Sequence, residues 1–395
     1  MRTQVGIIGA GPAGLVLAHL LARAGIEAVI LEARSRAYVE GRIRAGVMEH
    51  WVAELLARLG LGGRMRREGL VHRGIYLRLR GETHHIDFAA LVGRTITVYG
   101  QQEVVKDLIA AWLERGGGLL FEAEAVAVEE PHSERPRIRF RHEGAMRVLE
   151  CDWVAGCDGF HGVSRAALAD AAVAYERVYP YAWLGILAAA PPPSEELIYA
   201  NHERGFALSS MRGPHLSRLY LQVDPGTRLD DWPDERIWEE LERRLHGPGF
   251  RLARGPVLQR GVTPMRSFVV EPMARGRLLL AGDAAHIVPP TGAKGMNLAV
   301  ADVCRLAAAL IAAVRHRSPQ KLERYSADCL ARVWKVQHFS WWMTRMLHRD
   351  PDATPFDERR QLGELGALVE STAARQWLAE NYTGLPMDGI EELFA

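Results

Sequence analysis

Cysteine is scarce in this chain, whose 395 residues include only four. They are Cys151, Cys157, Cys304 and Cys329. Their spacing suits neither a disulfide framework nor a CxxC metal site, so we expect four free thiols. His84 and His85 are adjacent, but no group of Cys, Asp or Glu completes a recognisable ligand set with them. We interpret both as surface histidines and predict no metal site.

Excess charge and long apolar runs are absent as well. The chain has 49 basic and 48 acidic residues, a formal charge of +1. This balance gives no general field for holding nucleic acid, so we expect no nucleic-acid partner. No uninterrupted apolar run approaches the roughly 18 residues of a membrane span, and the N-terminus has no signal-peptide cleavage region. These absences favour a cytoplasmic protein without a membrane partner.

The length and the opening residues predict a multidomain enzyme that begins with a βαβ unit. A chain of 395 residues exceeds one compact core of ordinary size. Residues 4–8 are apolar and β-branched, residues 13–24 have helical spacing before Gly25, and residues 28–31 are apolar again. This order spells strand, glycine turn, helix and strand.

Strand signals dominate residues 181–223 and indicate a second domain built on a sheet. Residues 319–395 are mostly helical in pattern. The other predicted elements include helices at 102–115, 238–245 and 295–314 and strands at 74–79, 119–129, 137–141, 148–157 and 276–281.

The glycine turn carries a nucleotide-binding motif. Gly9, Gly11 and Gly14 form GxGxxG between a strand and a helix, where backbone N–H groups can approach a pyrophosphate. Glu32 follows at the end of the second strand, where a carboxylate can accept both ribose hydroxyls of an adenosine. We therefore predict that this unit binds a dinucleotide, either NAD or FAD.

Two further motifs favour FAD. The apolar segment 278–280 delivers Gly282 and Asp283 at its carboxyl end, the position of a flavin's ribityl contact. Gly295 and Asn297 then open the long helix, whose N-terminal dipole could stabilise a reduced flavin. The third motif, CDGFHGVSR at 157–165, contains Asp158 after another apolar strand.

In this order the three motifs resemble the single-component flavin-dependent aromatic hydroxylases, in which the Asp-Gly segment serves flavin and nicotinamide nucleotide binding. Longer stretches resemble the 4-hydroxybenzoate 3-monooxygenase family, from the first residues to about Pro386. They are GRIRAG (41–46), VYGQ (98–101), ELIYANH (196–202), SFVVEPM (267–273) and residues 282–295.

The resemblance implies an α/β fold with a Rossmann-like FAD-binding domain, an interleaved β-sheet substrate domain and a C-terminal helical region. It places the FAD-binding domain at residues 1–70, 97–175 and 268–318, and the substrate domain at 71–96 and 176–267. Residues 319–395 form the helical region, in which we expect the contacts of a homodimer.

The implied reaction uses bound FAD, NADPH or NADH, and O2. A flavin C4a-hydroperoxide hydroxylates 4-hydroxybenzoate at its 3-position, giving 3,4-dihydroxybenzoate. The alternatives are a hydroxylase of another benzoate and a flavin-binding sensor without hydroxylase activity; an NAD-dependent dehydrogenase would lack the Gly-Asp motif. NADPH and NADH both stay open, because Ala33 departs from the NADPH-specific pattern while Arg34 and Arg36 could pair with a phosphate.

The resemblance also implies the residues that act on the phenol. Tyr199 would touch the substrate hydroxyl, Tyr382 would hydrogen-bond to Tyr199, and His72 would be the solvent end of a proton path. Pro290 would present its backbone carbonyl to the same hydroxyl.

Ser210, Arg212 and Tyr220 match the residues that bind the substrate carboxylate, with Arg212 supplying a bidentate ion pair. Ser210 and Arg212 alternate with Met211 on a predicted strand, so the two polar side chains should share a face.

The remaining implied cofactor contacts belong to the FAD site. Arg218 and Asn297 would lie near the flavin ring, and Arg42, Arg44 and Gln101 would line the pyrophosphate and the channel through which the flavin moves.

Overall fold

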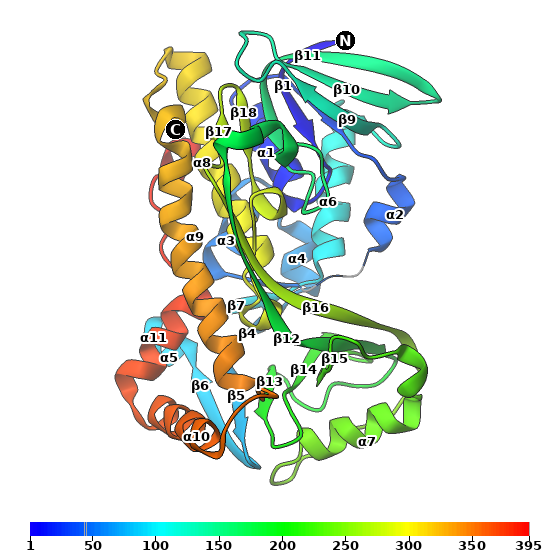
Figure 1. Ribbon diagram of the computed structural model, residues 1–395, viewed down its shortest axis with the longest axis vertical. Coiled ribbons are helices and arrows are strands. Elements are labelled where there is room, and N and C mark those ends of the chain that lie inside the picture. The colour runs from blue at the N-terminus through cyan, green and yellow to red at the C-terminus, as the bar shows by residue number, and fades with distance from the viewer. Residues whose placement is uncertain (43, 45, 395) are drawn as a thin grey trace.

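The computed structural model describes residues 1–42, 44 and 46–394. Figure 1 shows two sheets, one above the other, with the long helix α9 running beside both. A third, small antiparallel sheet has the order β3-β7-β4. Its strands are β3 (Val47–Met48), β4 (Leu70–His72) and β7 (Ile96–Val98).

The first sheet confirms the predicted βαβ unit, which consists of β1 (Arg2–Ile8), α1 (Pro12–Arg23) and β2 (Ala28–Leu31). Its central order is β17-β18-β11-β1-β2-β8, and β10 pairs with both β11 and β9. The strands added here are β8 (Gly118–Leu120), β9 (Glu124–Glu129), β10 (Arg137–His142), β11 (Ala145–Gly156), β17 (Ala274–Arg275) and β18 (Leu278–Leu280).

Strands β1, β2, β11 and β18 are parallel to one another. Their carboxyl ends therefore lie at one edge of the sheet, where ligands of such sheets bind. The three motifs of the sequence follow three of these strands, so the fold gathers them at a single edge.

The strand predicted at 119–129 is wrong, because two short strands occupy this stretch. Glu122 has a φ of +55°, in the left-handed region that interrupts an extended chain. On either side of it, β8 pairs with β2 and β9 pairs with β10. The segment thus changes partners within the sheet.

The second sheet has the order β19-β16-β12-β15-β14-β13-β5-β6. Its pairs are antiparallel except for β13 and β5. These strands are β5 (Gly74–Leu79), β6 (Glu82–Asp87), β12 (Val173–Ala188), β13 (Ile198–Asn201), β14 (Ala207–Gly213), β15 (Leu216–Val223), β16 (Val257–Glu271) and β19 (His286–Ile287).

Two long strands, β12 and β16, connect the upper and lower parts of the molecule (Figure 1). They pair along most of their lengths. The domain boundaries expected at 175/176 and 267/268 therefore fall inside continuous strands.

Helices cover both sheets, and those predicted at 102–115, 238–245 and 295–314 are present. The α-helices after α1 are α2 (Arg36–Gly41), α3 (His50–Arg58), α4 (Gly63–Glu68), α5 (Phe88–Val92), α6 (Gln101–Glu114), α7 (Asp234–Arg244), α8 (Gly295–His316), α9 (Gln320–Leu347), α10 (Pro355–Glu370) and α11 (Thr372–Thr383). Short 3-10 turns follow Ala281, at Gly282–Ala284 (η3), and Pro289, at Pro290–Gly292 (η4).

Helix α8 is long and apolar enough to cross a membrane by composition alone. In the fold it packs between α1 and α9, and 67% of its most apolar stretch is buried. Its apolar character is thus explained by its place in the core of the upper part.

Candidate active site

The first glycine motif closes tightly around the end of β1. Gly9 has a φ of +103°, and a Cβ there would lie 2.4 Å from the Cys157 carbonyl oxygen. A Cβ on Gly14 would lie 2.0 Å from the Gly9 carbonyl oxygen. At Gly11, by contrast, a Cβ would meet nothing within 4 Å. Two glycines therefore permit backbone packing, while the third leaves open the approach to the helix N-terminus.

Glu32 lies against this loop. One carboxylate oxygen accepts the Ala10 N–H at 2.8 Å, and the other accepts the Arg34 N–H at 2.8 Å. The carboxylate is therefore held between the glycine turn and the end of β2, in the position from which ribose hydroxyls are bound in dinucleotide folds.

Asp158 follows β11 at the same edge. Its Oδ2 accepts the Ser164 N–H and hydroxyl, each at 2.9 Å, and so closes the loop of the Asp-Gly motif. Its Oδ1 is buried without a hydrogen-bond partner among the described residues. Burial raises the pKa of this carboxyl group. One acceptor atom is thus available to a ligand.

The Gly-Asp motif after β18 accepts support from a buried carboxylate that the sequence did not reveal, through a hydrogen bond to the Gly282 N–H. Asp302, on α8, accepts the Gly282 N–H at 2.9 Å and lies 2.5 Å from His286 Nε2. Burial opposes charge on His286, but Asp302 raises the pKa of its imidazole above the usual value. Asp302 stands 20 residues after Gly282 inside a helix, where no local pattern marks it.

Asp283 itself is exposed, in the 3-10 turn that follows β18. Desolvation raises its pKa, whereas the positive charges of His286, Arg44 and Arg42 oppose that change. The pKa of Arg44 is lowered chiefly by desolvation, and the positive charges of Arg42 and Arg218 lower it further. Three guanidinium groups and one carboxylate from distant segments therefore share one electrostatic environment, which suits an anionic ligand that also carries hydroxyl groups.

The start of α8 is tied to the small sheet. Asn297 Oδ1 accepts the Glu49 N–H at 2.9 Å, and Asn297 Nδ2 donates to the carbonyls of Val47 and Ala293 at 3.0 and 2.9 Å. Asn297 thus uses its amide to fix the start of α8.

Two other predicted cofactor residues begin helices. Gly295 is the first residue of α8, and Gln101 is the first residue of α6.

A buried ion pair joins the starts of α8 and α3, and its lysine also binds α11. Lys294 Nζ donates to Glu49 Oε1 at 2.7 Å, and also to the carbonyls of Asn381 and Tyr382. Burial lowers the pKa of Lys294, while the Glu49 carboxylate counteracts that effect. A Cβ on Gly384 would lie 2.4 Å from Glu49 Oε2, so glycine is needed beside the pair. Lys294 thereby holds the backbone that carries Tyr382.

Two buried tyrosines meet in the hydrophobic core that includes residues of β13 and α11. The Tyr199 and Tyr382 hydroxyl oxygens are 2.5 Å apart, and each side chain is 1% exposed. Burial raises the pKa of both hydroxyls. The predicted pair is therefore brought together by β13 and α11, and it can relay a proton without contact with bulk water.

His72 is buried at the end of β4, and neither of its ring nitrogens has a hydrogen-bond partner among the described residues. Burial lowers its pKa to about 4, and the negative charge of Glu196 acts in the opposite direction. Both ring nitrogens of this buried imidazole therefore keep their capacity to exchange a proton with a hydrogen-bonding partner.

Ser210 and Arg212 share a face as predicted, since Arg212 Nη1 donates to Ser210 Oγ at 3.0 Å. The same nitrogen donates to the Met211 carbonyl at 2.7 Å, whereas Arg212 Nε is buried without a partner among the described residues. Burial lowers the pKa of Arg212, and nearby Tyr220 opposes this effect. The Arg212 guanidinium on β14 therefore keeps an N–H donor that is free to bind a ligand.

Tyr220 and Arg218 lie beside it on β15. Arg218 Nε donates to the Tyr220 hydroxyl at 3.3 Å, and Arg218 Nη1 is buried without a partner within the described chain. Gly185, on β12, makes room for both, because a Cβ there would lie 3.0 Å from Arg218 Nη2. Unpaired donors from Arg212 and Arg218 make this sheet a site for an anion.

An aromatic stack supports this part of the sheet. Trp183 Nε1 donates to His348 Nε2 at 2.6 Å, and His348 Nδ1 donates to the Thr344 carbonyl at 2.8 Å. Since an indole only donates and a carbonyl only accepts, His348 is the neutral Nδ1–H tautomer. Its burial lowers its pKa to about 3. The Trp183 and Tyr220 ring centroids are 4.8 Å apart, so the hydrogen bonds that fix Trp183 also support Tyr220.

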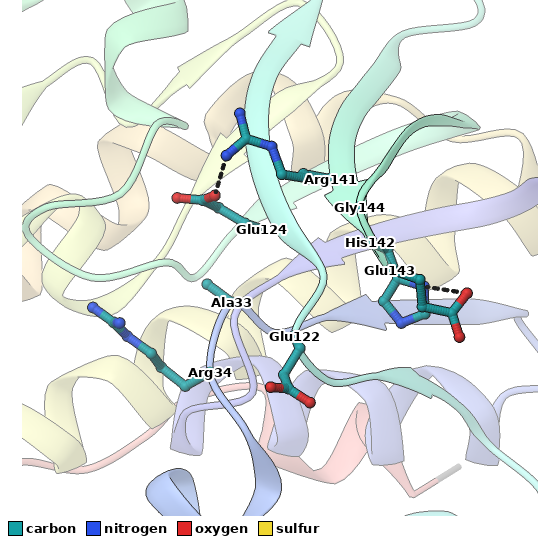
Figure 2. Close-up of a pocket in the computed structure, with 8 residues that line it drawn as sticks. All are labelled: Ala33, Arg34, Glu122, Glu124, Arg141, His142, Glu143 and Gly144. Carbon is teal, nitrogen blue, oxygen red and sulfur yellow. Dashed lines mark ion pairs between the residues drawn. The ribbon is translucent and has the colours of Figure 1, made fainter.

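A cavity of about 310 Å³ lies beside Arg34 (Figure 2). It is lined by Ala33, Arg34, Glu122, Glu124, Arg141, His142, Glu143 and Gly144. Arg141 is paired with Glu124 at 3.6 Å, and Arg36, on α2, is paired with Glu40 at 2.6 Å. Arg141 in the cavity lining and Arg36 on the nearby α2 are therefore already matched by carboxylates.

Known proteins are similar to this chain in sequence and in fold. The model of the FAD binding domain family matches residues 2–340. The p-hydroxybenzoate hydroxylase of Acinetobacter baylyi (strain ATCC 33305 / BD413 / ADP1) is 47% identical over 391 residues, covering 98% of this chain and 96% of that protein. The 3-amino-4-hydroxybenzoate 2-monooxygenase of Streptomyces cremeus is 26% identical, covering 97% of this chain and 96% of that protein.

Among solved structures, the p-nitrophenol 4-monooxygenase of Pseudomonas putida DLL-E4 has the same fold. Its TM-score is 0.83 at 19% identity, with 98% of this chain and 99% of that chain covered. The fold and the motif-bearing edge of the first sheet are those of FAD-dependent monooxygenases. The chain belongs to the FAD-dependent aromatic hydroxylase family that includes p-hydroxybenzoate hydroxylase, and it is an oxidoreductase with FAD as its cofactor.

Proposed function

We propose that this enzyme hydroxylates 4-hydroxybenzoate at the 3-position to give 3,4-dihydroxybenzoate. The observation that carries the proposal is the juxtaposition of two recognition groups in one buried region. The Tyr199–Tyr382 hydroxyl pair serves a phenol, and Arg212 with Ser210 and Tyr220 serves a carboxylate. A substrate with one group at each end of an aromatic ring satisfies both.

The sheet register supports this pairing of subsites. Tyr199 on β13 is opposite Leu208 on β14, and Leu208 is opposite Tyr220 on β15. Adjacent strands lie about 4.8 Å apart. The backbones of Tyr199 and Tyr220 are therefore separated by two strand spacings, or about 10 Å. This separation is suited to a single benzene ring with substituents at opposite positions.

The residues of this chain also account for activation of the ring. A phenolate is a stronger nucleophile than a phenol, so removal of the hydroxyl proton favours attack on an electrophilic oxygen. Tyr199 accepts this proton while passing its own to Tyr382, and His72 takes up the proton beyond the pair. We propose that the Pro290 carbonyl, at the start of η4, orients the same hydroxyl.

The edge of the first sheet fits FAD. Gly9, Gly11 and Gly14 leave the approach to α1 open, Glu32 would hold the ribose, and Asp158 offers an unpaired oxygen. Gly282 and Asp283 would bind the ribityl chain. Bound FAD supplies the activation of O2 after reduction by a nicotinamide nucleotide.

The remaining cofactor roles follow the charges of the site. We propose Arg42, Arg44 and Gln101 as pyrophosphate and channel contacts. Arg218 would favour the catalytic position of the flavin, and Asn297 with Gly295 would place the N-terminal dipole of α8 beside the ring.

We propose that NADH and NADPH are both used, with weak discrimination between them. Arg36 is already paired with Glu40, and carboxylates line the cavity beside Arg34. Arg36 and Arg141 are thus already matched, and the carboxylates around Arg34 weaken its attraction for a 2′-phosphate. Values of kcat/KM for the two nucleotides test this directly, and a ratio above roughly 100 in either direction would contradict it.

The resemblance also favours a cytoplasmic homodimer without a membrane or nucleic-acid partner. The oligomeric state is measured by light scattering during gel filtration, and a monomer at micromolar concentration would overturn that part of the proposal.

The deciding experiment mixes FAD-loaded protein with 4-hydroxybenzoate and O2. Oxidation of NADPH and of NADH is followed separately while 3,4-dihydroxybenzoate is quantified. We expect one product molecule per nucleotide oxidised. Rapid oxidation that yields only hydrogen peroxide would point to another benzoate as the substrate, and oxidation unaffected by any aromatic acid would refute the hydroxylase function.

A further inference from the structure

The corner between β4 and β5 brings a buried histidine close to the molecular surface. His72 is 1% exposed, but its chain neighbours Val71 and Arg73 are both exposed. Gly74 follows two residues later as the first residue of β5. A group bonded to Gly74 is therefore well placed to connect His72 with solvent.

Glu196 is such a group. Its Oε1 accepts the Gly74 N–H at 2.9 Å, and its Oε2 lies 2.7 Å from His85 Nε2. The Glu196 side chain is 13% exposed, whereas that of His85 is 36% exposed. The pair thus runs from the partly buried Gly74 backbone to an imidazole in contact with bulk water.

The backbone is shaped to admit this imidazole. A Cβ on Gly74 would lie 2.9 Å from His85 Nε2 and 2.1 Å from the Ile86 carbonyl oxygen. The His85 ring also packs on Tyr76, with 4.8 Å between the centroids. Glycine at position 74 therefore leaves the space in which the His85–Glu196 pair forms.

The charge of Glu196 acts on His72. Burial disfavours the protonated imidazole of His72, and the Glu196 carboxylate favours it. A proton that reaches His72 is thus stabilised by Glu196 during its passage. Neither ring nitrogen of His72 has a hydrogen-bond partner among the described residues, so either one is able to bond a water that bridges to Glu196.

We propose that Glu196 and His85 carry the proton path from His72 to solvent. The proposal rests on the proposed function, in which the substrate phenol loses its proton to the tyrosine pair. One O–H bond of the substrate breaks, a proton moves through the hydroxyls to His72, and one proton leaves from His85 to bulk water. No electrons are transferred. A histidine at the exposed end suits this task, because an imidazole exchanges protons readily near neutral pH.

The neighbouring histidine supplies a matched control. His84 and His85 are consecutive on β6, so their side chains point to opposite faces. His84 Nε2 lies 3.7 Å from Glu82, not from Glu196. His84→Gln therefore removes an equivalent imidazole without touching the proposed path.

The test follows proton release when FAD-loaded protein is mixed with 4-hydroxybenzoate in a stopped-flow instrument. A pH-indicator dye in weak buffer reports the proton, and absorbance reports the bound phenolate. In His85→Gln and Glu196→Gln we expect both rates to fall roughly tenfold or more, with the dissociation constant of the substrate unchanged. Added imidazole should restore the rate in His85→Gln, which a purely structural defect would not allow.

Native rates in His85→Gln would overturn the proposal, whatever the Glu196 variant does, and so would equal slowing in His84→Gln. Since His85 lies at the surface, its variant is expected to fold. Failure of the proposed function looks different: the native protein itself would release no proton on binding 4-hydroxybenzoate.

Discussion

Removal of Arg212 should weaken binding of an aromatic acid far more than binding of its neutral amide. The guanidinium lies on β14, hydrogen-bonded to Ser210 and to the Met211 carbonyl, and its Nε is buried without a partner among the described residues. Loss of one member of a buried charge pair costs about 2–5 kcal/mol. Because Ser210 and Tyr220 would still contact the carboxylate, we expect the lower part of that range for Arg212→Ala, about 3 kcal/mol.

This energy corresponds to an increase of roughly 150-fold in the dissociation constant of 4-hydroxybenzoate. The assay is equilibrium titration of FAD-loaded protein, with 4-hydroxybenzamide as the neutral comparison. Arg212→Lys should lie between the native protein and Arg212→Ala, since lysine keeps the charge but not the planar pair of donors. Arg228→Ala is the control, because Arg228 is 77% exposed. Equal weakening of the acid and the amide, or no weakening of either, would refute the assignment of Arg212 to the carboxylate.

Three further substitutions test other parts of the site. Tyr199→Phe removes the hydrogen bond to Tyr382, so we expect substrate-stimulated NAD(P)H oxidation to continue but to yield mostly hydrogen peroxide; unchanged product per nucleotide would remove Tyr199 from proton transfer. Gly11→Ala adds a Cβ that meets no protein atom within 4 Å, so the protein should fold with unaltered stability but bind FAD at least roughly tenfold more weakly. Native FAD affinity in this variant would show that the ligand does not approach there. His348 has a pKa lowered to about 3, so the unfolded chain takes up its proton first as pH falls below about 6.5, and this histidine destabilises the fold by about 2 kcal/mol at pH 5. His348→Phe keeps the ring but loses the Trp183 hydrogen bond, so its unfolding midpoint should be lower at pH 7 and should fall less between pH 7 and pH 5 than in the native protein; an identical pH dependence would contradict the neutral buried imidazole.

Much of the upper part of the molecule could be predicted because its signals are local. The glycines of the first motif stand within six residues of one another, and the turn they permit depends on contacts between near neighbours such as Gly9 and Gly14. Helical and strand periodicity likewise located α1, α6 and α8. The strand expected at 119–129 failed because a left-handed residue, Glu122, divides it, and glutamate gives no warning of that conformation.

The supporting residues of the site could not be predicted from the residues alone. Asp302 holds the Gly-Asp motif from inside a helix, and Glu49 pairs with Lys294 across 245 positions of the chain. His85 was interpreted as a surface histidine, and it is exposed, but its pairing with Glu196 bridges 111 positions. Such partners are chosen by the packing of distant elements, so no spacing in the sequence marks them.

The sequence by itself indicated the class of ligand, since a glycine turn between a strand and a helix brings backbone N–H groups to a pyrophosphate, and two further local motifs favoured FAD. The tertiary structure decided the chemistry of the proposed substrate site. Tyr199 and Tyr382 are 183 positions apart, and neither hydroxyl can relay a proton until β13 and α11 place the two buried oxygens 2.5 Å from each other. The physical reason is that backbone turns depend on neighbouring residues, whereas a proton path requires side chains to meet in space.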